Sequence, residues 1–177
     1  MDLIYRAVES DELCIELFAH FDRYQKVTHC WRKEDGRWVI KPVAFTEQWG
    51  EKEYRSLALD LQNTLKNGGV VFGVFADGQL KGFSEVTAEP LGPEKEYLEL
   101  SSLHVSYDFR RQGAGKKLLS LAADWARDKG AKKLYISAHS SVESQAFYRA
   151  VGCVDAVYPD AAHVEKEPCD CQLEYRL

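Results

Sequence analysis

The most informative part of this chain is residues 103–117, which read LHVSYDFRRQGAGKK. It begins in an apolar run that is typical of a strand and ends in the most strongly periodic helix of the sequence. Between them lie Gly113 and Gly115, and glycines let the main chain pass close to a ligand. The first N–H groups of a helix have no partner within it, and with the helix dipole they favour an anion, above all phosphate. The glycine pair alone is equally compatible with an ordinary helix start.

Two well-known phosphate loops do not fit this stretch. A Walker loop that ends at Gly115-Lys116 requires glycine where Arg110 stands, and serine or threonine where Lys117 stands. A dinucleotide fingerprint that starts at Gly113 requires glycine where Leu118 stands. A phosphate site in this stretch would therefore be of another kind, and an ordinary helix start stays open.

Outward from this loop, the pattern predicts one mixed sheet with helices on both faces. The central strands follow one another as a meander around the turn Asp77-Gly78, which favours a mixed sheet over a doubly wound one. Residues 27–50, aromatic and charged together, indicate either an irregular excursion or a short strand pair. A helix is expected to start at an N-cap, Ser10, and to run on through the apolar residues up to Phe21. The other predicted strands are 3–8, 70–75, 79–89, 97–106, 132–139, 154–158 and 171–175, and the other predicted helices are 51–67, 113–128 and 141–151.

Composition sets the broad class of protein. The chain has 177 residues, of which 45% are hydrophobic and 29% charged, which suits one globular domain. The formal net charge of −5 argues against a nucleic-acid partner. Residues 110–133 nevertheless hold eight basic side chains against two acidic ones, a net of +6, which leaves −11 for the rest. This local reversal favours a polyanionic ligand. The predicted location is cytoplasmic, with reduced cysteines, because neither a signal peptide nor a membrane span is recognisable.

Several motifs in register resemble the GNAT N-acetyltransferase superfamily. The string RRQGAG at 110–115 is similar to the family signature Q/R-x-x-G-x-G/A, and Leu103-His104-Val105 is similar to the L-x-V that ends its fourth strand. AFYRAVGC at 146–153 resembles the family ending FYxxxGF. The strong resemblance covers residues 70–153, and the element order extends it over a single domain, 1–177. Three positions depart from the pattern: Ser141 replaces an asparagine, Ser144 an alanine and Cys153 a phenylalanine.

The resemblance implies a single mixed, largely antiparallel twisted sheet and acetyl-CoA as co-substrate, without a metal. Main-chain N–H groups of residues 112–116 are expected to cradle the pyrophosphate. The pantetheine arm is expected between the strand that ends at Val105 and the strand 134–139. The residues implied in cofactor binding are Leu103, His104, Val105, Arg110, Arg111, Gln112, Gly113, Ala114, Gly115, Lys116, Ser141, Ser144 and Phe147.

Acetyl transfer to an amine needs a base, an N–H donor for the oxyanion and an acid for the thiolate. An alkylamine has a pKa of about 10.4 and must lose a proton before it attacks. Glu99 is our candidate base, on the expectation that it shares a strand face with Ser101 and Leu103. A water chain could also take the proton, and His139 and Glu85 are rival bases. Val105 is the candidate N–H donor, and Tyr148 the candidate acid.

The acceptor is expected to be a small-molecule amine, similar to an aminoglycoside, a streptothricin or a polyamine. Aromatic and acidic residues between Trp31 and Trp49 suit a cationic amine, although core packing accounts for most tryptophans. Two alternatives stay open: a protein or peptide N-acetyltransferase, and an acyl-CoA-binding sensor without turnover. Neither a membrane nor a nucleic acid is an expected partner, and the chain is expected to be a monomer or a homodimer. Cys169-Asp170-Cys171 with His163 lacks the spacing and the fourth ligand of a zinc site.

Overall fold

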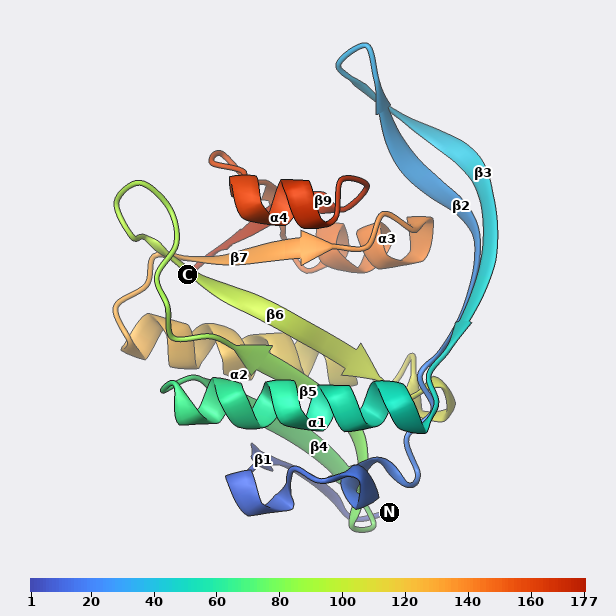
Figure 1. The fold of residues 1–177 in the computed structure, drawn as a ribbon, viewed down its shortest axis with the longest axis vertical. Coiled ribbons are helices and arrows are strands. Elements are labelled where there is room, and N and C mark those ends of the chain that lie inside the picture. The colour runs from blue at the N-terminus through green and yellow to red at the C-terminus, as the bar shows by residue number, and fades with distance from the viewer.

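Seven strands form one mixed sheet in the order β1-β4-β5-β6-β7-β9-β8, in a computed structural model that describes residues 1–177 (Figure 1). All neighbouring strands are antiparallel except β6 and β7, which are parallel. The single mixed sheet predicted from the meander is therefore confirmed. The strands are β1 (Leu3–Ala7), β4 (Val70–Ala76), β5 (Gln79–Val86), β6 (Tyr97–Val105), β7 (Lys133–Ala138), β8 (Val154–Asp155) and β9 (Cys171–Arg176).

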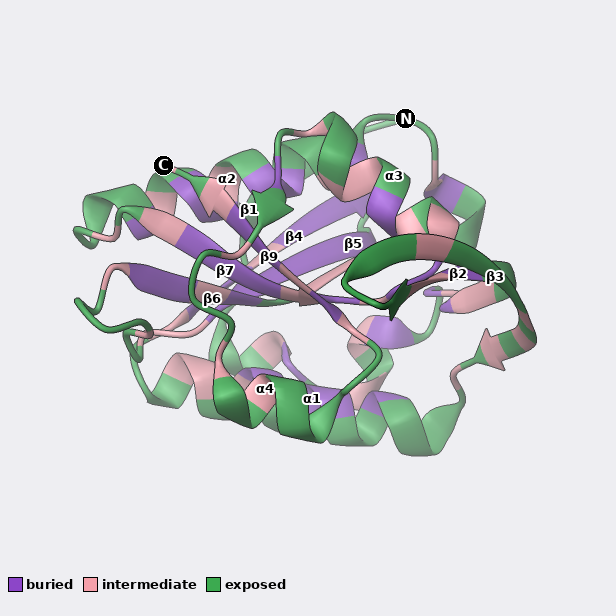
Figure 2. Ribbon diagram, turned by 90° about the horizontal axis from the view of Figure 1, so that it is seen from above, coloured by how far each residue is buried: buried purple, intermediate pink, exposed green.

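Helices cover both faces of the sheet. Figure 2 shows α2 (Ala114–Asp128) and α3 (Val142–Ala150) on one face, and α1 (Glu51–Lys66) and α4 (Ala161–Lys166) on the other. The apolar stripe of α2 explains its position, because Leu118, Ala122 and Ala126 are fully buried against the sheet. Burial of these stripes on the two faces of one sheet gives the domain its two core layers.

The β4–β5 hairpin has the turn that the sequence predicts. Asp77 and Gly78 both have positive φ, 48° and 80°. A two-residue turn with this backbone matches the twist of the strands that it joins, and Asp-Gly is a preferred sequence for it.

The segment at 27–50 is a strand pair, and it is much longer than expected. Strands β2 (Tyr24–Glu34) and β3 (Arg37–Gln48) form a two-stranded sheet of their own, which reaches along one side of the domain (Figure 1). Pro42 does not prevent the pairing, because it faces His29 at the point where the ladder changes register.

Three sequence-based expectations need correction. The helix predicted from Ser10 is two short 3-10 turns, Ser10–Glu12 and Ile15–Phe18, because the extended residue Cys14 separates them. Glu9, not Ser10, occupies the N-cap. The predicted strand 154–158 is only the two-residue β8, and the unpredicted helix α4 follows it.

Candidate active site

The site begins where the parallel strands β6 and β7 part. They pair only from Tyr97 to Glu99 against Lys133 to Tyr135. Beyond this point β6 stays with β5 as far as Val105, and β7 stays with β9. The two strands therefore diverge and leave a wedge-shaped gap in the middle of the sheet (Figure 1).

Main-chain groups of β6 and β7 face this gap. Ser106 N–H donates to Lys81 C=O, and hydrogen-bonded pairs alternate along an antiparallel ladder. The N–H and C=O groups of Leu103 and Val105 therefore point away from β5 and into the gap. On β7, Lys132 C=O accepts from Leu177 N–H of the neighbouring β9 side, so every second residue from Lys132 onward bonds to β9. Ser137 lies between two such residues, and its N–H and C=O groups therefore point into the gap. Both edges thus offer hydrogen bonds to an extended chain such as a pantetheine arm.

The loop between β6 and α2 presents a row of free donors. None of the main-chain N–H groups from Arg111 to Lys116 donates to an acceptor within the protein, and the first α2 bond on this end is from Lys117 N–H to Gly113 C=O. Arg111 and Gly113 have positive φ, 65° and 82°. This backbone turns successive N–H groups to one side, which is the geometry of an anion site. Ala114 is buried beneath the loop, whereas Gln112 is exposed.

Gly115 permits a close contact between two helices. A Cβ atom at this position would lie 3.2 Å from two ring atoms of Phe147 in α3 and 3.8 Å from a methyl group of Val105. Phe147 therefore lies against the start of α2 beside the end of β6. This contact joins the loop to α3 at the entrance of the gap.

Arg110 does not extend toward the loop's free donors. Its Nε donates to Val105 C=O at 3.2 Å and its Nη2 to Tyr24 C=O at 2.6 Å. The side chain therefore ties the end of β6 to the start of the β2–β3 hairpin. Its predicted part in cofactor binding stays a prediction, and the contacts seen in the structure are structural.

The N-terminus of α3 is capped by Ser141. The Ser141 side chain is fully buried, and its Oγ accepts from Ser144 N–H at 3.2 Å and from Gln25 Nε2 at 3.2 Å. The hydroxyl thus accepts two hydrogen bonds within the protein, and the predicted part of Ser141 in cofactor binding stays a prediction. Ser144 stands in the first turn of α3.

The β2–β3 hairpin lies across the open end of the gap. Near β6, Tyr107 N–H donates to Asp22 C=O just ahead of β2. Near α3, Trp31 N–H donates to Ser140 C=O, and Arg32 Nη1 donates to Ser140 Oγ at 2.7 Å. The hairpin is thus attached to both sides of the gap.

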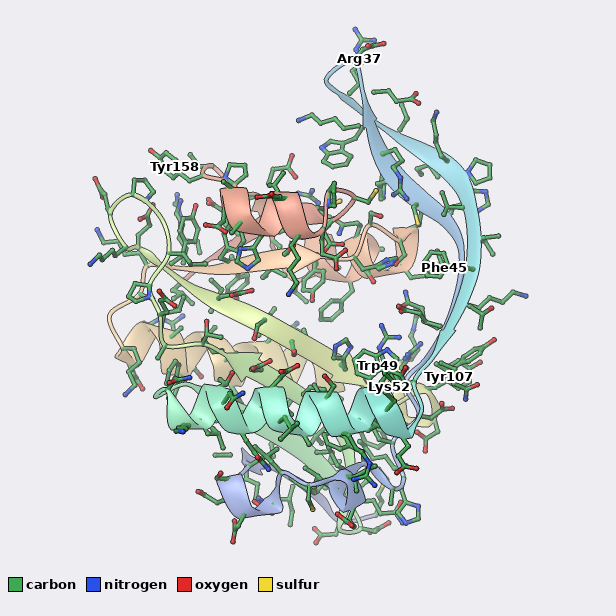
Figure 3. All side chains as sticks on the ribbon, viewed as in Figure 1. Arg37, Phe45, Trp49, Lys52, Tyr107 and Tyr158 are labelled. Carbon is green, nitrogen blue, oxygen red and sulfur yellow. The ribbon has the colours of Figure 1, made fainter.

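The hairpin's aromatic side chains divide between two places. Phe45 and Trp49 point inward from β3 and its end (Figure 3), and their rings lie 5.5 Å from His139 and 5.1 Å from His104. Trp31 instead lines an apolar cavity of about 240 Å³ against α3. Only part of the aromatic segment therefore lies beside the gap.

A β-bulge corrects the expected face of Glu99. The β5–β6 ladder pairs Val86 with Leu100 and Glu85 with Ser102, so Ser101 is an extra residue. Side chains after the bulge change faces. Glu99 contacts α4, whereas Leu103 packs with the buried residues of α2. The expectation that Glu99, Ser101 and Leu103 share one face is therefore wrong.

Glu99 belongs to a chain of three ionisable side chains. His163 Nε2 lies 2.7 Å from Glu99 Oε1, and His163 Nδ1 lies 2.6 Å from Asp160 Oδ2. Burial alone would lower the pKa of His163, but its hydrogen bonds to Asp160 and Glu99 outweigh burial and raise the pKa. Glu99 Oε2 has no partner within the protein and is not among the buried unpaired atoms. One oxygen of Glu99 is therefore held by His163, and the other is available.

His104 is a neutral imidazole. Burial, with the charges of Arg23 and Arg110, lowers its pKa to about 3. Arg23 Nε donates to His104 Nδ1 at 3.1 Å, so the single ring proton lies on Nε2. The side chain of His104 packs edge-on against Trp49 on the α1 side of β6, and the predicted part of His104 in cofactor binding stays a prediction.

The two rival bases, His139 and Glu85, both make hydrogen bonds within the protein. Ser141 N–H donates to His139 Nδ1 at 3.0 Å. Glu85 is buried, and its two carboxylate oxygens accept from the hydroxyls of Thr64 and Ser102. Glu85 therefore has no free carboxylate oxygen, whereas His139 keeps its second ring nitrogen, Nε2, without a partner and stays a rival base.

Tyr148 lies on α3 beside Phe147, with a ring distance of 5.2 Å. Burial, with nearby Cys153 and Asp170, raises the pKa of its phenol above the usual value. The hydroxyl therefore stays protonated at neutral pH, as a proton donor must before transfer. This hydroxyl makes no hydrogen bond within the protein.

The cysteines form no special arrangement. All five are free thiols; Cys171 is buried in β9, and Cys169 is exposed. No group of three or more His, Cys, Asp or Glu side chains is arranged to hold a metal ion. No helix is long and apolar enough to cross a membrane.

Comparisons with known proteins place this site in a family. Residues 32–153 match the model of the Acetyltransferase (GNAT) family, so the chain belongs to the GNAT acetyltransferases. None of the curated proteins matches the sequence. The chain is an N-acetyltransferase by family, and the resemblance stated from its motifs is confirmed.

Solved structures with the same fold carry related names. A protein assigned as a streptothricin acetyltransferase from Bacillus anthracis, in complex with acetyl coenzyme A, has a TM-score of 0.74 at 15% identity, over 100% of this chain and 99% of that chain. Nourseothricin acetyltransferase has a TM-score of 0.67 at 19% identity, over 98% and 96%. PaiA N-acetyltransferase from Thermoplasma acidophilum, in complex with coenzyme A, has a TM-score of 0.61 at 16% identity, over 100% of this chain and 100% of that chain. At these identities the likeness establishes the fold.

Sequence reasoning missed four side chains at the gap. Arg23, Gln25, Asp160 and His163 come from segments that carry no motif. An N-cap signal does precede α4, since Asp160 caps it by accepting from His163 N–H, but the short helix has too little periodicity to be recognised. Ser137 was also missed, and strict alternation along β7 could have indicated its main chain.

Proposed function

We propose that this protein transfers the acetyl group of acetyl-CoA to a primary amine of a small molecule. The gap between β6 and β7 carries this proposal, because the main-chain groups of Leu103 and Ser137 and the N–H of Val105 lead directly to the N–H groups of residues 111–116. This combination fits an extended amide-containing arm that ends in phosphates. When bound, acetyl-CoA supplies the acetyl group as an activated thioester.

The chain's own residues then complete the reaction. Glu99 Oε2 accepts a proton from the ammonium form of the amine, directly or through water, so the nitrogen lone pair can form the N–C bond as the C–S bond breaks. The new amide nitrogen then loses its second proton to water. The Val105 N–H faces the gap and donates to the acetyl oxygen. The Tyr148 hydroxyl gives its proton to the departing thiolate and regains one from solvent.

The hairpin supports a small acceptor. Its attachments at Tyr107 and at Ser140 lie on the two sides of the gap, so β2 and β3 narrow the approach from that end. Similarity to a streptothricin acetyltransferase over nearly the whole of both chains agrees with this choice. An extended peptide would have to cross the hairpin to reach the same point.

The test is a titration of purified protein with acetyl-CoA, followed by thiol release against a panel of amines. The panel contains aminoglycosides, polyamines, streptothricin and a lysine-containing peptide. We expect release with at least one small amine. Binding of acetyl-CoA without release from any amine would establish the sensor in place of the enzyme, and release from the peptide alone would establish a peptide acetyltransferase.

Gly113 provides a control for the cofactor site. A Cβ atom there meets nothing within 4 Å, yet the φ of 82° strains any other residue and the loop's free N–H groups surround it. Gly113→Val should therefore lower acetyl-CoA affinity about tenfold or more while the protein stays folded. Unchanged affinity would remove the loop from the phosphate site.

A further inference from the structure

Arg23 has a buried guanidinium that is only partly paired. The residue directly precedes β2, and its side chain is 10% exposed. Nε donates to His104 Nδ1 at 3.1 Å, and Nη2 donates to Gln25 Oε1 at 3.0 Å and approaches Glu47 Oε2 at 3.5 Å. Nη1 is buried and has no partner, and it is the one such side-chain atom in the whole protein. Native proteins pair nearly all such groups, so this exception needs an explanation.

The position of Arg23 relates it to the site. His104 stands between Leu103 and Val105, whose main-chain groups face the gap. From His104, hydrogen bonds run through Arg23 to Gln25 and on to Ser141 at the start of α3, which lies on the other side of the gap. This line of side chains joins the end of β6 to the start of α3. Arg23 therefore lies between the two elements that border the open end of the gap.

The charge around Arg23 favours an oxygen over an ammonium group. Glu47 is its one carboxylate partner, stands 3.5 Å away and is 42% exposed, so it compensates the buried cation poorly. A second guanidinium, that of Arg110, is close enough to act on the same imidazole. Trp49 covers one face of Arg23, with the guanidinium carbon 5.2 Å from the ring centre. The remaining need is an acceptor of hydrogen bonds at Nη1.

The geometry points to an oxygen of a carboxyl-derived group on the acceptor, bound at Arg23 Nη1. We therefore infer that the acceptor is an aminoacyl compound, in which the amine is attached through a carbon chain to a carboxylate or an amide carbonyl. This inference rests on the proposed transfer to an amine and narrows its substrate. Nε and Nη2 are already engaged, so the contact is made by one nitrogen, and either oxygen type can accept.

The first experiment uses the wild-type protein and three matched amines: lysine, lysinamide and 1,5-diaminopentane. They share the same alkylamine and differ in the carboxyl-derived group. A polyamine and an aminoglycoside are added to the set of amines that lack this group. Other amino acids and their amides are added to the set that carries it. We expect the best acceptors to carry the group, with kcat/KM about 10- to 100-fold above their matched amines, the range for a hydrogen bond to a buried charge. Lysine against lysinamide separates the carboxylate from the amide.

The second experiment compares Arg23→Gln with Arg32→Gln. Arg32 also joins the hairpin to the β7–α3 loop through its guanidinium, but it has no buried unpaired nitrogen. For Arg23→Gln, the kcat/KM of amines with the carboxyl-derived group should be no more than about threefold above that of their matched amines. The KM for acetyl-CoA should be unchanged. Arg32→Gln should keep the preference, whatever it does to the rate.

The outcomes separate this inference from the proposed function. Best acceptors that lack the group, or an Arg23→Gln variant that keeps the preference, would overturn the role of Arg23 and leave amine acetylation intact. A change in acetyl-CoA KM with the preference retained would assign Nη1 to the co-substrate instead. Acetyl-CoA binding without thiol release from any amine would overturn the proposed function and the inference together. If Arg23→Gln does not fold, the matched amines on the wild-type protein still decide the matter.

Discussion

Replacement of His163 by alanine tests the ionisation of the chain that holds Glu99. Each flanking carboxylate lies within hydrogen-bond distance of one ring nitrogen, 2.7 Å from Glu99 and 2.6 Å from Asp160. Two carboxylates accept at the same time only if both nitrogens carry hydrogen, so below the raised pKa of His163 the ring is an imidazolium. His163→Ala removes this cation and leaves two carboxylates without their partner.

The size of the effect follows from the two contacts. A hydrogen bond to a charged group contributes about 1.5–3 kcal/mol when it is buried. The three side chains are between 19% and 28% exposed, so solvent screens part of this interaction. We expect His163→Ala to lower the free energy of unfolding by about 2–3 kcal/mol near pH 6.

The pH dependence has a definite sign. The pKa of His163 is raised in the folded protein, so its charge stabilises the fold fully below the unfolded value of 6.5. This contribution is lost as pH rises through the higher folded pKa. The pKa of Asp160 is lowered, chiefly by its hydrogen bond with His163, so its contribution is lost in acid instead. The difference between wild type and variant should therefore be large near pH 6 and decline on the alkaline side.

Urea unfolding followed by tryptophan fluorescence measures this difference at about pH 6 and about pH 9. His29→Ala is the matched control, because His29 is exposed and its one side-chain hydrogen bond is with Thr28 Oγ1. The control should change stability by less than about 0.5 kcal/mol at both values. A difference for His163→Ala that stays constant, or that grows toward alkaline pH, would refute the imidazolium.

Three further substitutions probe the cofactor side of the site. Gly115→Val should push the Phe147 ring, which lies 3.2 Å from the position of the first added carbon, and calorimetry should show acetyl-CoA affinity about tenfold lower or worse; retained affinity would contradict this contact. Tyr148→Phe should lower kcat about 100-fold and leave the acetyl-CoA dissociation constant unchanged, and an unaltered kcat would exclude the phenol as the acid. Ser141→Ala removes the cap that Ser144 N–H uses, so thermal unfolding should show about 1 kcal/mol less stability; no loss would mean that the buried hydroxyl is not needed for α3.

The shape of the loop at 111–116 was predictable because it depends on the main chain. A backbone with positive φ at Gly113 and a close approach at Gly115 both require glycine, so the requirement appears in the sequence at fixed positions. Helix α2 follows at once with a regular apolar stripe, and the hairpin turn at Asp77-Gly78 has equally local causes. These features need no knowledge of distant contacts.

The face of Glu99 was not predictable, because a bulge leaves no clear mark in one strand. Ser101 is extra only in relation to β5, whose Glu85 and Val86 face Ser102 and Leu100. Alternation along the sequence therefore gives the wrong side for Glu99. Helix α4, which supplies its partner His163, has six residues, too few for a periodic pattern.

The two faces of the sheet contribute differently to the site. Because of the bulge and the parting strands, Leu103 and Val105 turn their side chains toward α2, whereas Glu99 turns toward α1 and α4. The side that faces α2 is built from main-chain groups, which suit a ligand common to a whole family. On the opposite side, Arg23 and Glu99 come from segments far apart in the chain and meet only through the topology.

Acceptor recognition of this kind can change by substitution of one side chain without any effect on the loop at 111–116. The net charge shows the same division, since residues 110–133 carry +6 and the rest carries −11. Arg23 is a buried cation in the part of the chain outside residues 110–133, which is acidic. Long-range attraction of a cationic amine does not explain it, because that attraction would favour only carboxylates near the acceptor. Arg23 needs a nearby hydrogen-bond acceptor. An acceptor substrate that carries an oxygen as well as an amine supplies this partner together with the group that is acetylated.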